Sequence, residues 1–215
     1  MTGKLLLRIA DRFPLHLQDP EEVRHMKVSG MHFAIRSFRV KGLGHVSVME
    51  AKGFFGLMKM DTLIITPTDV DMPLLSYDRV NAMGNDTLIF ELYDTLLGKT
   101  ELSALDRVKE EYAALPDHDL GEHWYDSIKL TQSIAKKGKR LHTAAFHAAA
   151  DAYLQAWLDC AEAAMPSKPD AKKEKASVYV EGLLQHGGPS TDVFKKSIGA
   201  EKTAELFRTV LFGTK

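Results

Sequence analysis

A single cysteine, Cys160, is present among the 215 residues of the chain. One thiol cannot form a disulfide within the chain, and it cannot supply the several sulfur ligands of an iron–sulfur cluster. Charge of one sign is not in excess either, because 28 basic residues stand against 29 acidic ones. Composition therefore favours neither a nucleic-acid partner nor a membrane-surface partner.

Long apolar runs are also missing. The chain starts with MTGKLLLRIADRF, whose short leucine run soon becomes charged, and no small-residue cleavage site follows it. No stretch of the sequence is long enough to cross a bilayer. We therefore expect a cytoplasmic protein.

Sequence motifs for common cofactors are absent. The glycines of GLG at 42–44 lack the strand–helix–strand context that a dinucleotide site needs. The stretch DHDLGEH at 117–123 is rich in side chains that can bind metals but lacks a standard ligand spacing. We expect a polar loop there and no metal site. No P-loop, zinc signature or nucleophile elbow occurs.

Strand-like patterns fill most of residues 30–95. Apolar side chains alternate with polar ones in five segments, separated by turn-forming residues. These segments are 31–35, 45–51, 58–67, 73–80 and 86–94. Connections this short cannot hold crossover helices, so consecutive strands should pair antiparallel as a meander.

Helix-like spacing flanks the strands on both sides. Helices are expected in 2–12, 19–27, 102–115, 142–165 and 201–212, with the charged stretch 166–175 as a solvated connection. We expect one domain over 1–215, with N-terminal helices in 1–28, an antiparallel meander in 30–95 and mainly helices in 100–215. This order predicts an α+β fold, a three-layer α/β/α sandwich whose central antiparallel sheet is flanked by helices.

Two acidic residues stand on apparently apolar strand faces. Asp78 should point the same way as its neighbours Leu74 and Val80, and Glu50 lies in the same alternation as Val48. Burying an ionised carboxylate without a partner is costly. Strand ends or bulges could turn these groups to solvent. Alternatively, they form a pair of buried carboxylates with raised pKa values that can hold and give protons near neutral pH.

The stretch TPTDVDMPLLSYD resembles a signature of the ferredoxin-dependent bilin reductases and red chlorophyll catabolite reductase. Its elements here are Pro67, Asp71, Pro73 and Asp78. The closing stretch STDVFKKSIGAEKTAELFRTVLFG and the helix-like AYLQAWLDCAEAA resemble other parts of the same family. The resemblance spans roughly residues 30–213 and implies the α/β/α sandwich fold.

The resemblance also implies roles for single residues. Asp78 falls on the catalytic aspartate that protonates the bound tetrapyrrole, and Glu50 falls where some members have a substrate-contacting glutamate. Where some members have a histidine, this chain offers Thr62 or Asp61. A second polar position of the family aligns with HGGPS, which leaves His186 as a candidate substrate contact. We expect Glu50 and Asp78 to line one pocket between the sheet and the C-terminal helices.

The implied activity is reduction of an open-chain tetrapyrrole, a bilin, with no bound flavin or metal. An acid in an apolar pocket keeps its proton, and a protonated pigment accepts an electron more readily than a neutral one. Electrons would come from reduced ferredoxin or flavodoxin. The candidate docking cations are Lys136, Lys137, Lys139, Arg140, Lys195 and Lys196. For the run 136–140, a basic helix end is the commoner explanation. A non-catalytic haem or bilin carrier of the same fold is the main alternative, and an unrelated α+β domain is a third.

Overall fold

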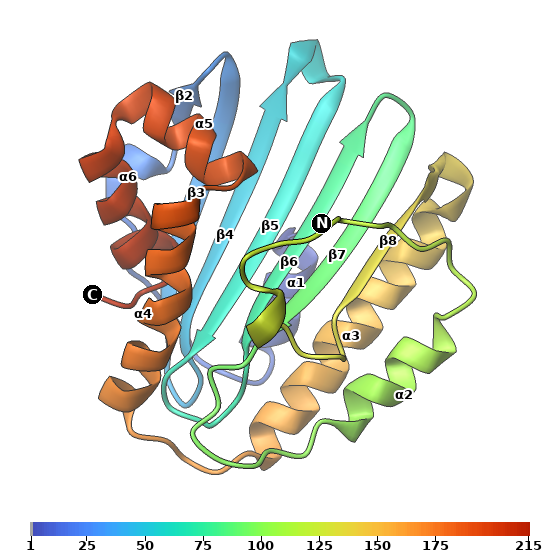
Figure 1. Cartoon of the computed structure of the whole chain (residues 1–215), viewed down its shortest axis with the longest axis vertical. Helices are drawn as coiled ribbons and strands as arrows, with labels where there is room; N and C mark the ends of the chain where they lie inside the picture. Colours follow the sequence, from blue (N-terminus) through green and yellow to red (C-terminus); the bar gives the residue numbers. More distant parts are fainter. Residues whose placement is uncertain (1) are drawn as a thin grey trace.

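An eight-stranded antiparallel sheet lies between two layers of helices (Figure 1). The computed structural model describes residues 2–215, apart from the side chains of Phe54 and Pro189. Residue 1, the first of the predicted N-terminal segment, lies outside the described residues. The arrangement confirms the predicted α/β/α sandwich. Among residues 2–215, no helix combines the length and the apolar character needed to span a membrane.

The strands pair in the order β1-β3-β4-β5-β6-β7-β8, and β2 pairs with β3 as well. Their bounds are β1 Leu15–Leu17, β2 Met26–Val28, β3 Met31–Val40, β4 Gly44–Gly53, β5 Met58–Pro67, β6 Leu74–Ala82, β7 Asn85–Tyr93 and β8 Ile134–Lys139. Strands β3 to β7 are consecutive antiparallel neighbours, which confirms the predicted meander. The β6–β7 turn places Met83 and Gly84 at φ values of 49° and 76°, and positive φ at both central residues suits the twist of a tight hairpin.

Helices cover both faces of the sheet. One face carries α1 (Thr2–Ala10), α2 (Ser103–Glu111) and α3 (Thr143–Ala163), and the other carries α4 (Pro169–His186), α5 (Pro189–Ile198), α6 (Ala200–Glu205) and the π-helical η5 (Leu206–Leu211). Single 3-10 turns are η1 (Glu21–Val23), η2 (Phe54–Gly56), η3 (Asp126–Ile128) and η4 (Arg140–His142).

Two apolar cores result, one on each side of the sheet. Strand residues such as Tyr77 and Phe90 pack with Trp157 of α3 in the first core. In the second core, Ile64 of β5 packs with residues such as Phe207 of η5. Because side chains alternate along a strand, a strand between two helical layers needs apolar residues on both of its faces.

Three predicted elements differ from the structure. Residues 19–27 form a 3-10 turn and the short strand β2 in place of a helix, because residues 26–28 pair with β3. The expected connection 166–175 holds the start of α4 at Pro169, where a missing N–H costs nothing. The basic run 136–140, which we expected at a helix end, lies mainly in β8 and pairs with β7.

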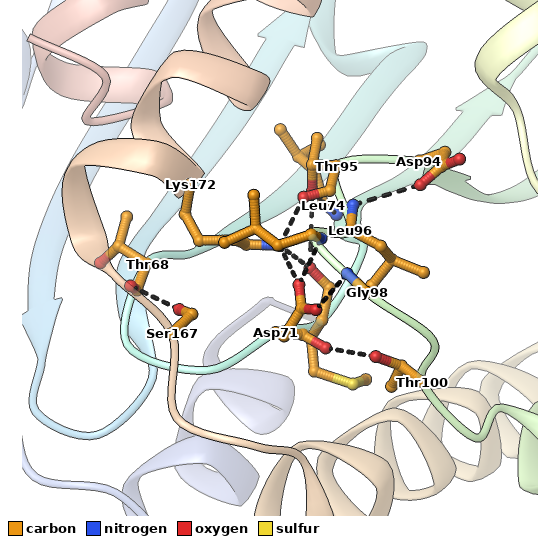
Figure 2. A network of polar contacts seen from close by, with 12 residues as sticks. Thr68, Asp71, Leu74, Asp94, Thr95, Leu96, Gly98, Thr100, Ser167 and Lys172 are labelled. Atoms are coloured by element: carbon orange, nitrogen blue, oxygen red, sulfur yellow. Dashed lines mark hydrogen bonds and ion pairs between the residues drawn. The ribbon is translucent and has the colours of Figure 1, made fainter.

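A buried lysine fixes α4 to the loops before β6 and after β7 (Figure 2). The Lys172 side chain is 0% exposed. Its ammonium lies 3.2 Å from Asp71 Oδ1 and donates to the carbonyl oxygens of Met72 and Thr95 at 2.7 and 2.6 Å. Burial lowers the pKa of Lys172, while the Asp71 carboxylate acts in the opposite direction.

Asp71 also organises the loop that follows β7. Its carboxylate accepts hydrogen bonds of 2.9 Å from the backbone N–H groups of Leu97 and Gly98. Its carbonyl oxygen accepts one of 2.8 Å from the hydroxyl of Thr100. The aspartate of the signature stretch therefore joins two loops and, through Lys172, the helix that forms one wall of the candidate site.

Candidate functional site

Asp78 lies in a row of three side chains that crosses neighbouring strands. The pairing places Met49 of β4 opposite Thr62 of β5, and Thr62 opposite Asp78 of β6. Directly paired residues share one face of a sheet. This row faces α4 and η5, and the Thr62 hydroxyl donates a hydrogen bond of 2.5 Å to Asp78 Oδ1.

A pocket of about 180 Å³ opens above this row, between the sheet and the C-terminal helices. Its lining residues are Met49, Thr62, Ile64, Ser76, Asp78, Glu91, Tyr93, His123, Trp124, Tyr125, Tyr179, Leu183, Gly187, Gly188, Ser190, Thr191, Phe207, Leu211 and Phe212. Asp78 thus lines a pocket between the sheet and the C-terminal helices, as predicted. Its walls are mainly aromatic and aliphatic, and acidic groups stand on the strand side.

The pocket favours the protonated form of Asp78. Burial, the largest cause, and the negative charge of Glu91 both raise the pKa of Asp78, whose net value is about 6. The hydrogen bond from Thr62 acts against both, because it stabilises the carboxylate form. Asp78 can therefore hold a proton and release it near neutral pH.

Glu91 is a second acid of this pocket that sequence reasoning missed. It pairs with Ser76, which makes it a diagonal neighbour of Asp78 on the same face, at a typical Cβ separation of about 7–8 Å. Glu91 is 8% exposed, and the Tyr93 hydroxyl donates to its Oε2 at 2.7 Å. The alternation of Ile89, Glu91 and Tyr93 is the sequence pattern that indicates this acid, since it places a carboxylate between two largely apolar side chains on one face of β7.

The outer wall is an aromatic segment, residues 123–125. The Trp124 ring stacks on Tyr179 of α4 with a centroid distance of 5.7 Å, and Tyr179 stacks on Tyr93 at 3.9 Å. Trp124 fits against α4 only because position 182 is glycine. A Cβ on Gly182 would lie 2.2 Å from Cη2 of Trp124. The polar loop expected around 117–123 thus leads directly into a half-buried aromatic wall of the pocket.

Glu50 does not share this pocket, and the prediction that it does is wrong. Glu50 pairs with Asp61, and Asp61 pairs with Arg79, which places all three on the opposite face of the sheet. There, Glu50 Oε1 accepts a hydrogen bond of 2.6 Å from the hydroxyl of Thr2 in α1. The prediction that Asp61 contacts a substrate in this pocket is wrong for the same reason. Met49 occupies the place expected for Glu50.

The other two predicted contacts lie differently. Thr62 lines the pocket floor beside Asp78. His186 is exposed at the end of α4, and its ring stacks on Trp124 with a centroid distance of 5.3 Å. His186 therefore lies behind the aromatic segment rather than beside Asp78.

One predicted docking cation is not available for a partner. Lys136 is 5% exposed, and its ammonium bonds to Asp117 Oδ1 at 2.6 Å and to the carbonyl oxygen of Leu115 at 3.0 Å. Lys195 is half-buried and donates to the carbonyl oxygen of Leu184. The exposed members of the predicted set are Lys137, Lys139, Arg140 and Lys196.

Metal ligands do not gather at this site. Within the part of the chain that the structure describes, no group of three or more histidine, cysteine, aspartate or glutamate side chains could hold a metal ion. The chemistry that the pocket itself offers is proton transfer from carboxylic acids, next to aromatic surfaces on which a flat ligand can stack.

Comparison with known proteins gives a structural relationship. No family model matches the sequence, and no curated protein matches it. Among solved structures, the fold is similar to that of phytochromobilin synthase from tomato in complex with biliverdin. The TM-score is 0.81 at 13% sequence identity, and the similarity covers 99% of this chain and 82% of that chain. The two chains share a fold.

Proposed function

We propose that this protein reduces an open-chain tetrapyrrole, a bilin, with Asp78 as proton donor and a ferredoxin-type protein as electron donor. One observation carries the proposal: Asp78 lies in an aromatic-walled pocket that raises its pKa to about 6. The fold supports it, because the tomato enzyme of similar fold was solved with biliverdin.

The chemistry needs little more than this pocket. Reducing one double bond of a conjugated pigment takes two electrons and two protons. Asp78 gives the first proton to the pigment, and the resulting cation accepts an electron from the donor protein. Aromatic side chains such as Tyr93 and Tyr179 supply stacking surface for the flat pyrrole rings. Because the pigment itself takes up the electrons, we expect it to act as the substrate without a bound flavin or metal.

The proposed electron donor is an acidic ferredoxin or flavodoxin. The candidate contacts are the exposed cations Lys137, Lys139, Arg140 and Lys196. Attraction between exposed charges is screened over a Debye length of about 8–10 Å at physiological salt. Turnover should therefore fall as ionic strength rises at fixed pigment concentration. A rate that is independent of salt would remove these cations from the proposal.

A non-catalytic haem or bilin carrier is the second candidate. It is favoured by the stretch that begins at His186, because the positions of this stretch that line the pocket include Gly187 and Gly188. A glycine cannot present an acid to the ligand. A carrier would bind the pigment and leave its absorption spectrum unchanged when reduced ferredoxin is added.

The deciding experiment compares wild type with Asp78→Asn. Purified protein is mixed with biliverdin, and absorption spectra are recorded before and after reduced ferredoxin is added. Asp78→Asn keeps the size and polarity of the side chain but removes the transferable proton. We expect binding to persist and reduction to slow by about 10²- to 10⁴-fold.

Glu50→Gln is the matched control. It removes a carboxylate from the opposite face of the same sheet and should leave the rate unchanged. If wild type binds biliverdin but never reduces it, the carrier function replaces the reductase. If Asp78→Asn reduces biliverdin as fast as wild type, Asp78 is not the proton donor.

A further inference from the structure

Glu91 stands between the pocket and the outside. It lines the pocket that contains Asp78, and it also lines a groove of about 210 Å³ on the other side, together with His118, Asp119 and Lys129. His118 is half-buried and Asp119 is exposed. One residue thus lines both an inner pocket and an outer groove, and its carboxylate lies 3.8 Å from the ammonium of Lys129 in the groove.

The groove exists because β8 leaves β7 at this point. Pairing between the two strands ends at Phe90 and Ile134, and contact resumes at the bridge between Tyr93 and Lys129. The chain at 130–133 bulges between these positions. Position 91 therefore has no directly paired residue on the β8 side, and the groove reaches its carboxylate.

The two oxygens of Glu91 have different surroundings. Oε2 accepts the hydrogen bond from Tyr93, which orients the carboxylate. Oε1 is buried and has no hydrogen-bond partner within residues 2–215, while the Lys129 ammonium lies 3.8 Å away. A buried acceptor without a hydrogen bond is costly. Oε1 therefore forms an ion pair with Lys129 and can still accept a hydrogen bond from a polar group of a ligand.

We infer that Glu91 is a second catalytic acid, which receives protons from the groove and delivers the second proton of each reduction to the pigment. This inference rests on the proposed function. Asp78 donates the first proton and becomes a carboxylate. Glu91 is a carboxylate while Asp78 holds its proton, since its charge raises the pKa of Asp78. Once Asp78 has donated, Glu91 takes up a proton from water in the groove. After the second electron arrives, Glu91 donates this proton to the reduced pigment and becomes a carboxylate again.

The positions of Asp78 and Glu91 suit the donation of the first and the second proton, respectively. Asp78 lies on the pocket floor, which the bound pigment would cover, so reloading it requires the pigment to leave. Glu91 has access to the groove, so it can be reloaded while the pigment stays bound. The scheme consumes two electrons, from two molecules of a one-electron iron–sulfur donor, and two protons for each double bond reduced.

The test follows single turnovers of Glu91→Gln with biliverdin and reduced [2Fe–2S] ferredoxin. Glutamine keeps the length of the side chain and an oxygen that can accept from Tyr93. We expect biliverdin affinity within about 3-fold of wild type. At a pH well below the Asp78 pKa of about 6, where Asp78 is protonated in both proteins, the first electron transfer should occur at the normal rate. The half-reduced pigment radical should then accumulate, with its decay slowed by about 10²-fold or more.

Two further variants distinguish a chemical role of Glu91 from a structural one. Glu91→Asp keeps the acid on a shorter side chain and should restore radical decay at least partly, which a structural role for glutamate would not predict. Glu50→Gln again serves as a control and should not accumulate the radical.

The possible outcomes are distinct. Wild type that binds biliverdin without reducing it ends the proposed function. Normal reduction by wild type with an unchanged radical lifetime in Glu91→Gln ends only the role of Glu91. If Glu91→Gln does not fold, the comparison of Glu91→Asp with wild type decides. Loss of both pigment binding and radical decay in Glu91→Asp would show that Glu91 has a structural role. Slowed radical decay with normal pigment binding would support Glu91 as the second acid.

Discussion

The Thr62 hydroxyl lies 2.5 Å from Oδ1 of Asp78, across the paired strands β5 and β6. This contact stabilises the carboxylate, whereas burial and the charge of Glu91 stabilise the acid. The pKa of about 6 is the balance of these opposed effects. The hydrogen bond and the charge come from different side chains, so each of these two effects can be altered separately.

Removing the Thr62 hydroxyl should shift the pH dependence of the reaction. Thr62→Val abolishes the hydrogen bond to the carboxylate, so the pKa of Asp78 should rise above its present value of about 6. Because protonated Asp78 is the donor, the rate falls as pH rises through this pKa. The descending limb of kcat/KM should therefore move to higher pH in the variant. Ser76→Ala, at another pocket hydroxyl on β6, should leave this limb in place.

Asp78 should also reduce the stability of the folded chain at neutral and higher pH. Its pKa is about 6 in the folded chain against 3.8 for the unperturbed group, so the folded state binds more protons than the unfolded state between these two pH values. Stability contributed by the protonated side chain is therefore present at low pH and lost as pH rises through about 6.

Asp78→Asn should be more stable than wild type at about pH 8 by about 1–2 kcal/mol and about equally stable at about pH 4. The lower end of that range allows for solvent at the open side of the pocket. Urea unfolding of both proteins at the two pH values measures the difference. Equal stability at the higher pH would contradict the raised pKa.

The order of strands β3 to β7 was predictable, whereas β1, β2 and β8 and the face on which each acid lies were not. The alternation of side chains identified β3 to β7, because residues on each face of a strand recur at every second position. In a sheet covered on both sides, however, this period does not tell which face holds the pocket. Met49 and Glu50 differ by one position, and only the pairing of β4 with β5 decides between them.

The parts that were missed depend on contacts between distant segments. The charged start of α4 is typical of a solvated connection, yet Lys172 is buried because Asp71 and two carbonyl groups from loops 77 to 101 positions earlier bind its ammonium. Trp124 lies in a stretch without hydrophobic periodicity, and its packing against α4 depends on the missing side chain of Gly182. Neither relationship has a local signature in the sequence.

Lys172→Met should destabilise the chain strongly. The substitution leaves the Asp71 carboxylate and the carbonyl oxygens of Met72 and Thr95 without their ammonium partner. Breaking a buried ion pair from one side typically costs about 3–5 kcal/mol. Lys175→Met, at an exposed position of the same helix, should change the free energy of unfolding by no more than about 0.5 kcal/mol.

A double variant identifies the cause of that loss. Asp71→Asn combined with Lys172→Met removes the charge that Lys172→Met leaves unpaired, and it should be less destabilised than the sum of the two single variants. Denaturant unfolding of the four proteins gives the coupling energy. Strict additivity would show that the Lys172–Asp71 contact contributes nothing of its own.

The last prediction concerns the aromatic segment 123–125 and the size of the pocket. The pocket of about 180 Å³ is smaller than the roughly 300–1,000 Å³ typical of sites for ligands of drug or cofactor size. Trp124 occupies part of the space between the sheet and α4. We therefore expect the segment to move outward when a tetrapyrrole binds. The apparent affinity of the pigment is then reduced by the fraction of molecules in which the segment is closed.

Gly182→Ala should favour the open arrangement, because the added Cβ would lie 2.2 Å from Cη2 of Trp124. We expect red-shifted tryptophan fluorescence in the free protein and faster association with biliverdin. Gly3→Ala is the matched control, since it is also a helical glycine and a Cβ there has nothing within 4 Å. Recording fluorescence in a Trp157→Phe background assigns the signal to Trp124. Slower association or weaker binding in Gly182→Ala would instead make closed Trp124 part of the binding surface itself, and the segment would then not act as a barrier to the pigment.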